Sequence, residues 1–147
     1  EVQKADPAKK DFRGNKYYEV CDRYRLRWLD VPYEPGELKV VAYGKDGKPA
    51  LTETVRTAGK PARVKLEKRR FGELLFVTAT IVDEKGVLVP DADDELSFTC
   101  GKDLQFVAIC NGDATSTESF VVPHMKAFHG QLVAIFRGTG DEVECKR

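Results

Sequence analysis

The sequence predicts an all-β protein, with an immunoglobulin-like β-sandwich over residues 60–147 and a truncated second β-sandwich domain before it, over residues 1–59. Two observations predict this fold class. Apolar and polar residues alternate with a period of two in almost every segment after residue 16, and turn-forming residues separate these segments at regular intervals. In addition, no segment carries the apolar stripe of a helix.

The first domain opens with a polar, lysine-rich stretch, residues 1–16, which we expect to be flexible. In the predicted strand at 24–28, aromatic and leucine side chains share one face and arginines share the other, as in a half-buried strand. Further strands are predicted at 38–43 and 51–58. The Gly44–Gly47 segment between them has two glycines that can adopt positive φ, which is typical of a hairpin turn.

This first domain looks incomplete. Residues 17–58 supply only three or four strands, too few to cover the apolar face and the edges of a sandwich. The chain also begins Glu-Val-Gln-Lys, without methionine, so we expect the opening strands to lie upstream of Glu1. Exposed strand edges can pair with another copy, and if a homodimer forms, residues 17–58 are predicted to make much of the contact.

The second domain follows a linker at Gly59–Pro61 and supplies about seven strands, the number in one complete sandwich. Turn signals separate the strands, among them Asp83–Gly86 and Asn111–Asp113. The predicted strands lie at 62–67, 76–83, 96–100, 104–110, 119–122, 131–137 and 142–145, and a further short one lies at 87–89.

Composition and charge argue against two classes of partner. The 147 residues include 24 Lys+Arg and 24 Asp+Glu, so the net charge is zero, whereas nucleic-acid binding usually needs a basic face. No apolar run approaches the roughly 20 residues of a transmembrane helix, and no polybasic segment could hold anionic lipid. We therefore predict neither a nucleic-acid nor a membrane partner.

The cysteines suggest no metal or redox chemistry. Cys21, Cys100, Cys110 and Cys145 contain no CxxC pair, and their spacing with the two histidines matches no zinc site. We expect them to be ordinary thiols in strands or loops. The sequence predicts no cofactor.

The carboxylates also lack a catalytic pattern. A glycosidase normally holds two carboxyl groups on either side of the scissile bond. The acidic residues that can be placed fall mainly in turns or on solvent-facing strand positions, and we interpret them as solvated: Asp46, Asp83, Glu84, Asp91, Asp93 and Asp94. The chain is also shorter than the roughly 250 residues of a (β/α)₈ barrel. No catalytic residue is predicted.

Two loops are candidate binding sites. Asp91, Asp93 and Asp94 form a weak calcium candidate, because calcium prefers oxygen ligands, although the loop lacks the spacing of an EF-hand. The alternative is a charged loop that keeps a sheet edge soluble.

The polar loop from residue 111 to residue 118 is a candidate ligand site, with Asn111, Asp113 and Glu118 as the ligand-binding residues, for carbohydrate or a protein partner. Its alternative is structural, since Asn and Asp side chains bond to their own backbone and build turns.

Several segments, in order, resemble the C-terminal region of family 2 glycoside hydrolases, the β-galactosidase family. The two segments before residue 60 resemble one accessory domain and its end. The segments after residue 60 resemble the immunoglobulin-like domain that follows it. These segments span about residues 24–137 and include Arg27–Lys39, Val55–Gly59, Phe76–Ala79, Val82–Gly86, Val89–Asp93, Asn111–Asp113, Glu118–Phe120 and Lys126–Gly130.

This resemblance implies that the chain is a non-catalytic C-terminal part of a bacterial exo-acting β-glycosidase, secreted to the periplasm or beyond. In this family the two catalytic glutamates lie in a barrel that precedes the accessory domains, so no residue here inherits a catalytic role. The implied partners are that barrel and the neighbouring domains. The last strand, at 142–147, also looks shorter than that of the family, so the C-terminus is expected to be clipped.

Two other functions stay open at this stage. Aromatic residues and the polar 111–118 loop would suit a carbohydrate-binding module. Bacterial adhesins also use similar sandwiches as structural repeats, although residues 1–59 and 60–147 show no clear internal repeat.

Overall fold

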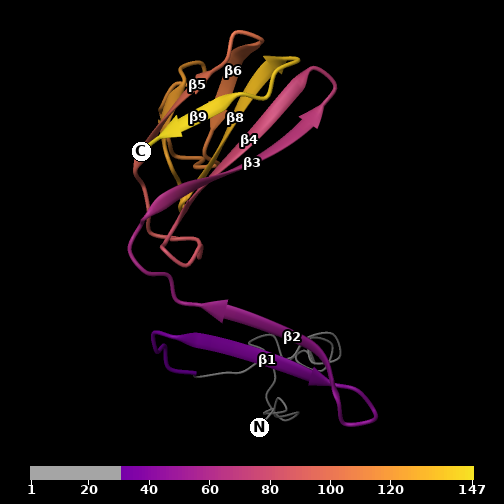
Figure 1. Ribbon diagram of the computed structural model, residues 1–147. Helices are drawn as coiled ribbons and strands as arrows, with labels where there is room; N and C mark the ends of the chain where they lie inside the picture. Colours follow the sequence, from indigo (N-terminus) through magenta and orange to yellow (C-terminus); the bar gives the residue numbers. More distant parts are fainter. Residues whose placement is uncertain (1–30) are drawn as a thin grey trace, which may run out of the picture. The chain divides into compact units, whose positions relative to one another are not determined.

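The computed structural model describes residues 31–147, which form nine β-strands and no helix (Figure 1). The strand predicted at 24–28, the flexible stretch predicted at 1–16 and Cys21 lie outside the described residues. In the described part, no helix is long and apolar enough to cross a membrane.

The first two strands form an antiparallel hairpin, β1 (Glu37–Tyr43) and β2 (Pro49–Arg56), close to the predicted bounds. The turn between them closes with a hydrogen bond from the Gly47 amide to the Gly44 carbonyl, and Gly47 has a φ of 74°. Leu38 lies opposite Val55 in the register, and both are exposed. Val40 and Leu51 are exposed on the same face, beside Glu53, so this face of the hairpin is mostly apolar and uncovered within the described residues. Whether this hairpin belongs to a truncated sandwich stays a prediction.

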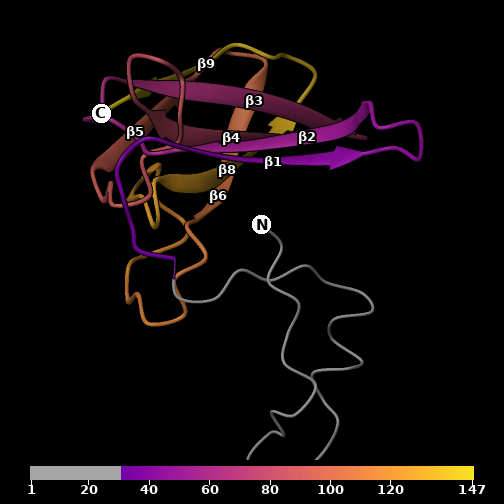
Figure 2. The same ribbon diagram turned by 90° about the horizontal axis from the view of Figure 1, so that it is seen from below.

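The remaining seven strands form two antiparallel sheets (Figures 1 and 2), so the predicted β-sandwich is confirmed. The four-stranded sheet has the order β3 (Arg63–Phe71), β4 (Leu74–Val82), β8 (Gln131–Gly138), β6 (Leu104–Cys110). The three-stranded sheet has the order β7 (His124–Lys126), β5 (Glu95–Cys100), β9 (Val143–Lys146).

The strand count of four plus three is that of a constant-type immunoglobulin domain. The order of two strands differs, because β7, the fifth strand of the sandwich, lies in the three-stranded sheet and β8, the sixth, lies in the four-stranded sheet. In the immunoglobulin order the fifth strand joins the larger sheet and the sixth joins the smaller one.

Two predicted strands, at 87–89 and at 119–122, are wrong. In the first, Leu88 forms only an isolated bridge with Val82. The second segment crosses from one sheet to the other instead of pairing along either. The Phe120 carbonyl accepts a hydrogen bond from Ile109 of β6, and the Pro123 carbonyl accepts one from Phe98 of β5. The strand of this region is the three-residue β7, which begins only after Pro123.

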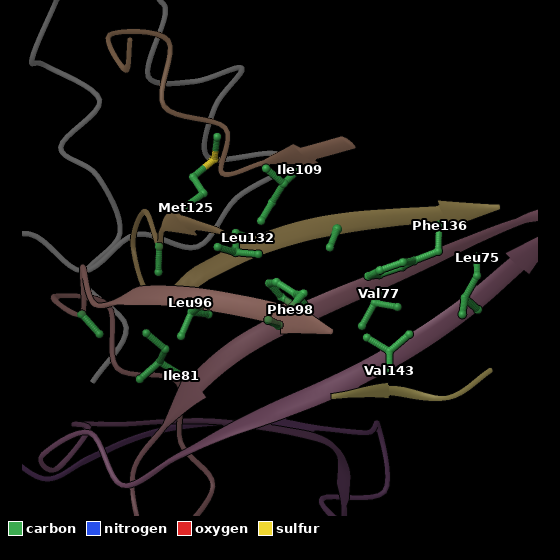
Figure 3. Packing of buried hydrophobic residues seen from close by; sticks show 14 of the residues in the cluster. Leu75, Val77, Ile81, Leu96, Phe98, Ile109, Met125, Leu132, Phe136 and Val143 are labelled. Carbon is green, nitrogen blue, oxygen red and sulfur yellow. The ribbon is translucent and has the colours of Figure 1, made fainter. Parts of the chain in front are cut away.

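The core lies between the two sheets. Every second residue of β4, from Leu75 to Ile81, is buried, as predicted from the period-two pattern. Figure 3 shows Val77 and Phe136 of the larger sheet converging with Phe98 of the smaller one. The ring centroids of Phe98 and Phe136 are 6.4 Å apart. Both sheets thus contribute to one continuous apolar cluster.

A tight turn joins β7 to β8. Phe128 pairs with Gln131, and the two residues between them, His129 and Gly130, both have positive φ, of 50° and 73°. A hairpin turn of the I′ type needs this conformation at both positions. A Cβ atom added to Gly130 would lie 2.3 Å from the carbonyl oxygen of Val89, so only glycine fits there.

Candidate functional site

The 111–118 loop connects β6 to β7 and is built by its own side chains. The Asn111 Oδ1 atom accepts a hydrogen bond of 3.0 Å from the Asp113 amide. Asp113 Oδ1 in turn accepts bonds from the Thr115 amide, at 2.8 Å, and from the Thr115 hydroxyl, at 2.7 Å. Such side-chain bonds to a backbone two residues on are typical of Asx turns.

These bonds set the charge state of Asp113. The amide hydrogen bond from Thr115 lowers the pKa of the Asp113 carboxyl, and the Thr115 hydroxyl and the nearby His129 lower it further. Because a carboxylate is a better acceptor than a carboxylic acid, the loop holds Asp113 in its ionised form.

Asn111 and Glu118 meet at the backbone of a single residue, Lys126 of β7. Asn111 Nδ2 donates to the Lys126 carbonyl at 3.0 Å, and Glu118 Oε1 accepts from the Lys126 amide at 3.1 Å. The Ser116 hydroxyl donates to the other oxygen of Glu118 at 3.2 Å. Since β7 pairs only with β5, these side chains satisfy backbone groups at an unpaired sheet edge.

All three predicted ligand residues therefore make hydrogen bonds within the protein. Asn111 and Glu118 brace the edge strand, and Asp113 shapes the loop between them. This is the structural role that the sequence left open for the loop. Ligand binding at these residues stays a prediction.

The three aspartates of the calcium candidate do not form a cluster. Asp91 and Asp93 are exposed on either side of the buried Ala92, and Asp94 Oδ1 forms an ion pair of 3.0 Å with Arg147 Nε. Across residues 31–147, no group of three or more His, Cys, Asp and Glu side chains is arranged to hold a metal ion.

Asp83 corrects one prediction, because it is not a solvated turn residue. Only 4% of its surface is exposed, and its carboxylate accepts three backbone hydrogen bonds. Oδ2 bonds to the Gly59 amide at 2.8 Å, and Oδ1 bonds to the amides of Lys85 at 2.9 Å and Val87 at 2.8 Å. Asp83 thus fastens the linker before the sandwich to the turn after β4. The pKa of its carboxyl is lowered, mainly by the bond from Gly59.

Sequence reasoning could find only part of this contact. Aspartate at the first position of a turn typically bonds the amide two residues on, as Asp83 does with Lys85. The bond to Gly59, however, joins residues that are 24 positions apart, and no local sequence pattern predicts it.

The described cysteines, Cys100, Cys110 and Cys145, are free thiols, as predicted. Burial raises the pKa of the Cys145 thiol to about 11, so it is protonated at neutral pH and a poor nucleophile. Cys100 borders an open depression of about 200 Å³, lined also by Glu142 and Glu144. Ligand sites usually have about 300–1,000 Å³, so this depression is small for a substrate.

Known proteins resemble this chain over both of its parts. The model of the family described as glycoside hydrolase family 2 C-terminal domain 5 matches residues 61–146. A second family model, described as domain of unknown function DUF4982, matches residues 9–51. The first of these matches covers more than half of the chain and coincides with the sandwich.

A curated relative, Beta-galactosidase BoGH2A of Bacteroides ovatus, is 34% identical over 131 residues, which are 85% of this chain and 15% of that protein. Among solved structures, a glycosyl hydrolase family 2 member from Bacteroides cellulosilyticus aligns with a TM-score of 0.70 and 29% identity, over 79% of this chain and 17% of its own. A beta-glycosidase from Bacteroides vulgatus gives a TM-score of 0.70 and 26% identity, over 79% and 16%. The chain thus spans about a sixth of the length of these relatives.

Proposed function

We propose, from the premise that the chain belongs to the glycoside hydrolase family 2 C-terminal domain 5 family, that it is a non-catalytic C-terminal part of a longer bacterial enzyme that hydrolyses O-glycosidic bonds. Its role there is structural: the sandwich packs against the catalytic barrel and neighbouring domains, and it helps to shape substrate access. The single observation that carries this proposal is the family match over residues 61–146.

Two further observations support a structural role. The relatives are about six times longer than the matched segment, so a longer polypeptide has room for the catalytic barrel elsewhere. The described candidate residues are also committed to internal bonds: Asn111 and Glu118 brace β7, and Asp83 holds the linker. Side chains used in this way build a rigid module.

Assays on nitrophenyl glycosides test the non-catalytic role. The longer polypeptide should hydrolyse at least one substrate of such a panel, whereas the 147-residue chain alone should give no turnover above the buffer blank. A longer polypeptide without residues 61–147 should unfold at a lower temperature and should show a changed KM. Turnover by the isolated chain would overturn the proposal.

The same experiment separates the alternatives. Calorimetric titration of the isolated chain with oligosaccharides tests the carbohydrate-binding module, and saturable binding would favour it over a purely structural role. Tandem sandwiches in place of a barrel in the longer polypeptide would favour the adhesin. Secretion to the periplasm or beyond is part of the proposal, and fractionation of the cells that make the longer protein checks it.

A further inference from the structure

The four-stranded sheet has a second apolar surface, on the face opposite the core. Side chains alternate between the two faces of a strand, and the buried set of β4 begins at Leu75, so Leu74 and Phe76 point to the outer face. The register places Phe71 of β3 opposite Leu74, and Ile135 of β8 opposite Phe76. We call these four residues, together with Val133 of β8, the outer patch.

The outer patch is accessible and ordered by its own contacts. Phe71 is 64% exposed, and the other four members are half-buried. The rings of Phe71 and Phe76 meet edge to face, with centroids 5.7 Å apart. Aromatic side chains held in this way at a surface are typical of the centre of a protein interface.

Two arginines flank the patch on the same face. The register places Arg69 of β3 opposite Phe76, and Arg137 of β8 opposite Leu74. Both are exposed, and neither makes an ion pair or a hydrogen bond within the described residues.

The other cations of β3 make bonds within the protein. Lys65 Nζ lies 2.7 Å from Glu67 Oε1, and Lys68 Nζ donates to the Asp141 carbonyl at 2.6 Å. Arg70 donates to the Gly138 carbonyl at 2.6 Å and also to the Gly140 carbonyl. Arg137 thus has no bonded partner in the described part of the chain, and Arg69 has only an unbonded electrostatic interaction with Glu67, whose carboxylate is already bonded to Lys65.

We infer that the outer patch docks on a neighbouring domain of the same longer polypeptide, against an apolar surface that presents carboxylates to Arg69 and Arg137. This inference rests on the proposed function. The partner must be acidic, since an unpaired guanidinium that is taken out of water needs an anion, and a carboxylate matches its two parallel donors.

A second copy of the chain fits the patch poorly. In a twofold dimer the same patch meets itself, so the two arginines of one copy would face a surface that carries the same two arginines. The Glu67 carboxylate beside Arg69 is already bonded to Lys65 and is not free to pair with them. Like charges brought together in this way oppose association. The longer polypeptide offers a better source, because the matched segment makes up only 15% of the curated relative.

Hydroxyl-radical footprinting, read by mass spectrometry, tests the inference. Phe71 should be oxidised several-fold more slowly in the longer polypeptide than in the 147-residue chain. Phe120, which is 50% exposed and lies outside the patch, serves as the internal comparison and should change less. Equal oxidation of Phe71 in both proteins would overturn the inference. Strong protection already present in the isolated chain would also overturn it, since the covering segment or copy would then be this chain itself.

Charge reversal gives a second readout. In the longer polypeptide, the double variant Arg69→Glu/Arg137→Glu should restore the oxidation of Phe71, whereas the matched double variant Lys102→Glu/Lys146→Glu, at exposed sites outside the patch, should not. The isolated chain should tolerate both variants with an unchanged unfolding temperature, which excludes misfolding as the cause. Continued protection of Phe71 in the arginine variant would contradict the role of the charges.

Failure of this inference can be told apart from failure of the proposed function. If the longer polypeptide hydrolyses glycosides, the isolated chain does not, and Phe71 is oxidised equally in both, the proposed function stands and only the docking surface is refuted. If the isolated chain itself hydrolyses glycosides, the proposed function falls, and with it the premise of the docking surface.

Discussion

At the scale of single residues, Asp83 carries the most structural information. Its carboxylate accepts hydrogen bonds from the amides of Gly59, Lys85 and Val87, which belong to two separate segments of the chain. A carboxylate can accept all three bonds, whereas an asparagine amide has only one oxygen and would turn an N–H group toward one of the donors. The position therefore selects for aspartate in its ionised form.

Replacing Asp83 should change the acid sensitivity of the protein. Folding lowers the pKa of this carboxyl, so the unfolded state takes up the proton more readily. Its stabilisation is then fully present above the ordinary aspartate pKa of about 3.9 and is lost as the pH falls through the lower, folded value. We expect Asp83→Asn to unfold several degrees below wild type at pH 7, with the gap narrowing from about pH 5 to pH 2.

Thermal unfolding followed by circular dichroism over this pH range checks the prediction. Glu84→Gln, at the exposed neighbouring position, is the matched control and should keep the pH dependence of the wild type. A gap between Asp83→Asn and wild type that stays constant down to pH 2 would contradict a role for the ionised carboxylate.

At the scale of elements, the 111–118 loop and β7 depend on each other. With three residues, β7 is the shortest strand of the sandwich and pairs on one side only. The side chains of Asn111 and Glu118 take the place of a neighbouring strand by bonding the two backbone groups of Lys126. This arrangement also covers the edge, which would otherwise be open to pairing with another chain.

Truncating the two bracing side chains should loosen β7. We expect Asn111→Ala and Glu118→Ala each to lower the free energy of unfolding by about 1 kcal/mol, the usual net contribution of a hydrogen bond. Urea denaturation measures this change, and hydrogen exchange should show faster exchange at the Lys126 amide for Glu118→Ala. Thr117→Ala, an exposed change in the same loop, should have little effect. An unchanged exchange rate at Lys126 would argue against bracing.

The elements show where sequence patterns succeed and where they stop. The long strands β4 and β8 were predictable, because each buries every second residue against one core. In β6 the alternation is interrupted, since a bulge between Phe106 and Ala108 shifts its register. The segment at 119–122 has the same alternation, with Phe120 and Val122 in step, but it crosses between sheets and forms only isolated hydrogen bonds. Alternation of apolar and polar residues indicates an extended backbone, but it does not indicate which strand that backbone pairs with.

The candidate site was predictable to a similar degree. The asparagine and aspartate of the 111–118 loop indicated a turn held by side chains, and the bonds of Asn111 and Asp113 confirm that turn. The second contact of Asn111, with Lys126, and the bond of Glu118 to the same residue depend on how β7 folds back beside the loop. Long-range placement of this kind follows from tertiary packing and leaves no local signal.

At the scale of the whole molecule, the two faces of the four-stranded sheet have different tasks. The inner face packs on the smaller sheet, and Phe136 at its centre is fully buried between Phe98 and Phe106. The outer face carries Phe71, which is 64% exposed and meets the ring of Phe76 edge to face. If the sandwich is a self-contained module, its stability should depend on Phe136 far more than on Phe71.

The pair of truncations Phe136→Ala and Phe71→Ala tests this division. In the 147-residue chain, Phe136→Ala should cost about 3–5 kcal/mol, because it removes a buried ring and leaves a cavity. Phe71→Ala should cost about 1 kcal/mol or less, since it loses one edge-to-face contact at the surface. Urea denaturation of both variants gives the comparison. Equal costs would mean that the outer face is already packed within the chain. The two costs could instead be unequal in the isolated chain and closer together in the longer polypeptide. That result would show that the outer face stabilises the assembly of domains and that the inner face stabilises the sandwich itself.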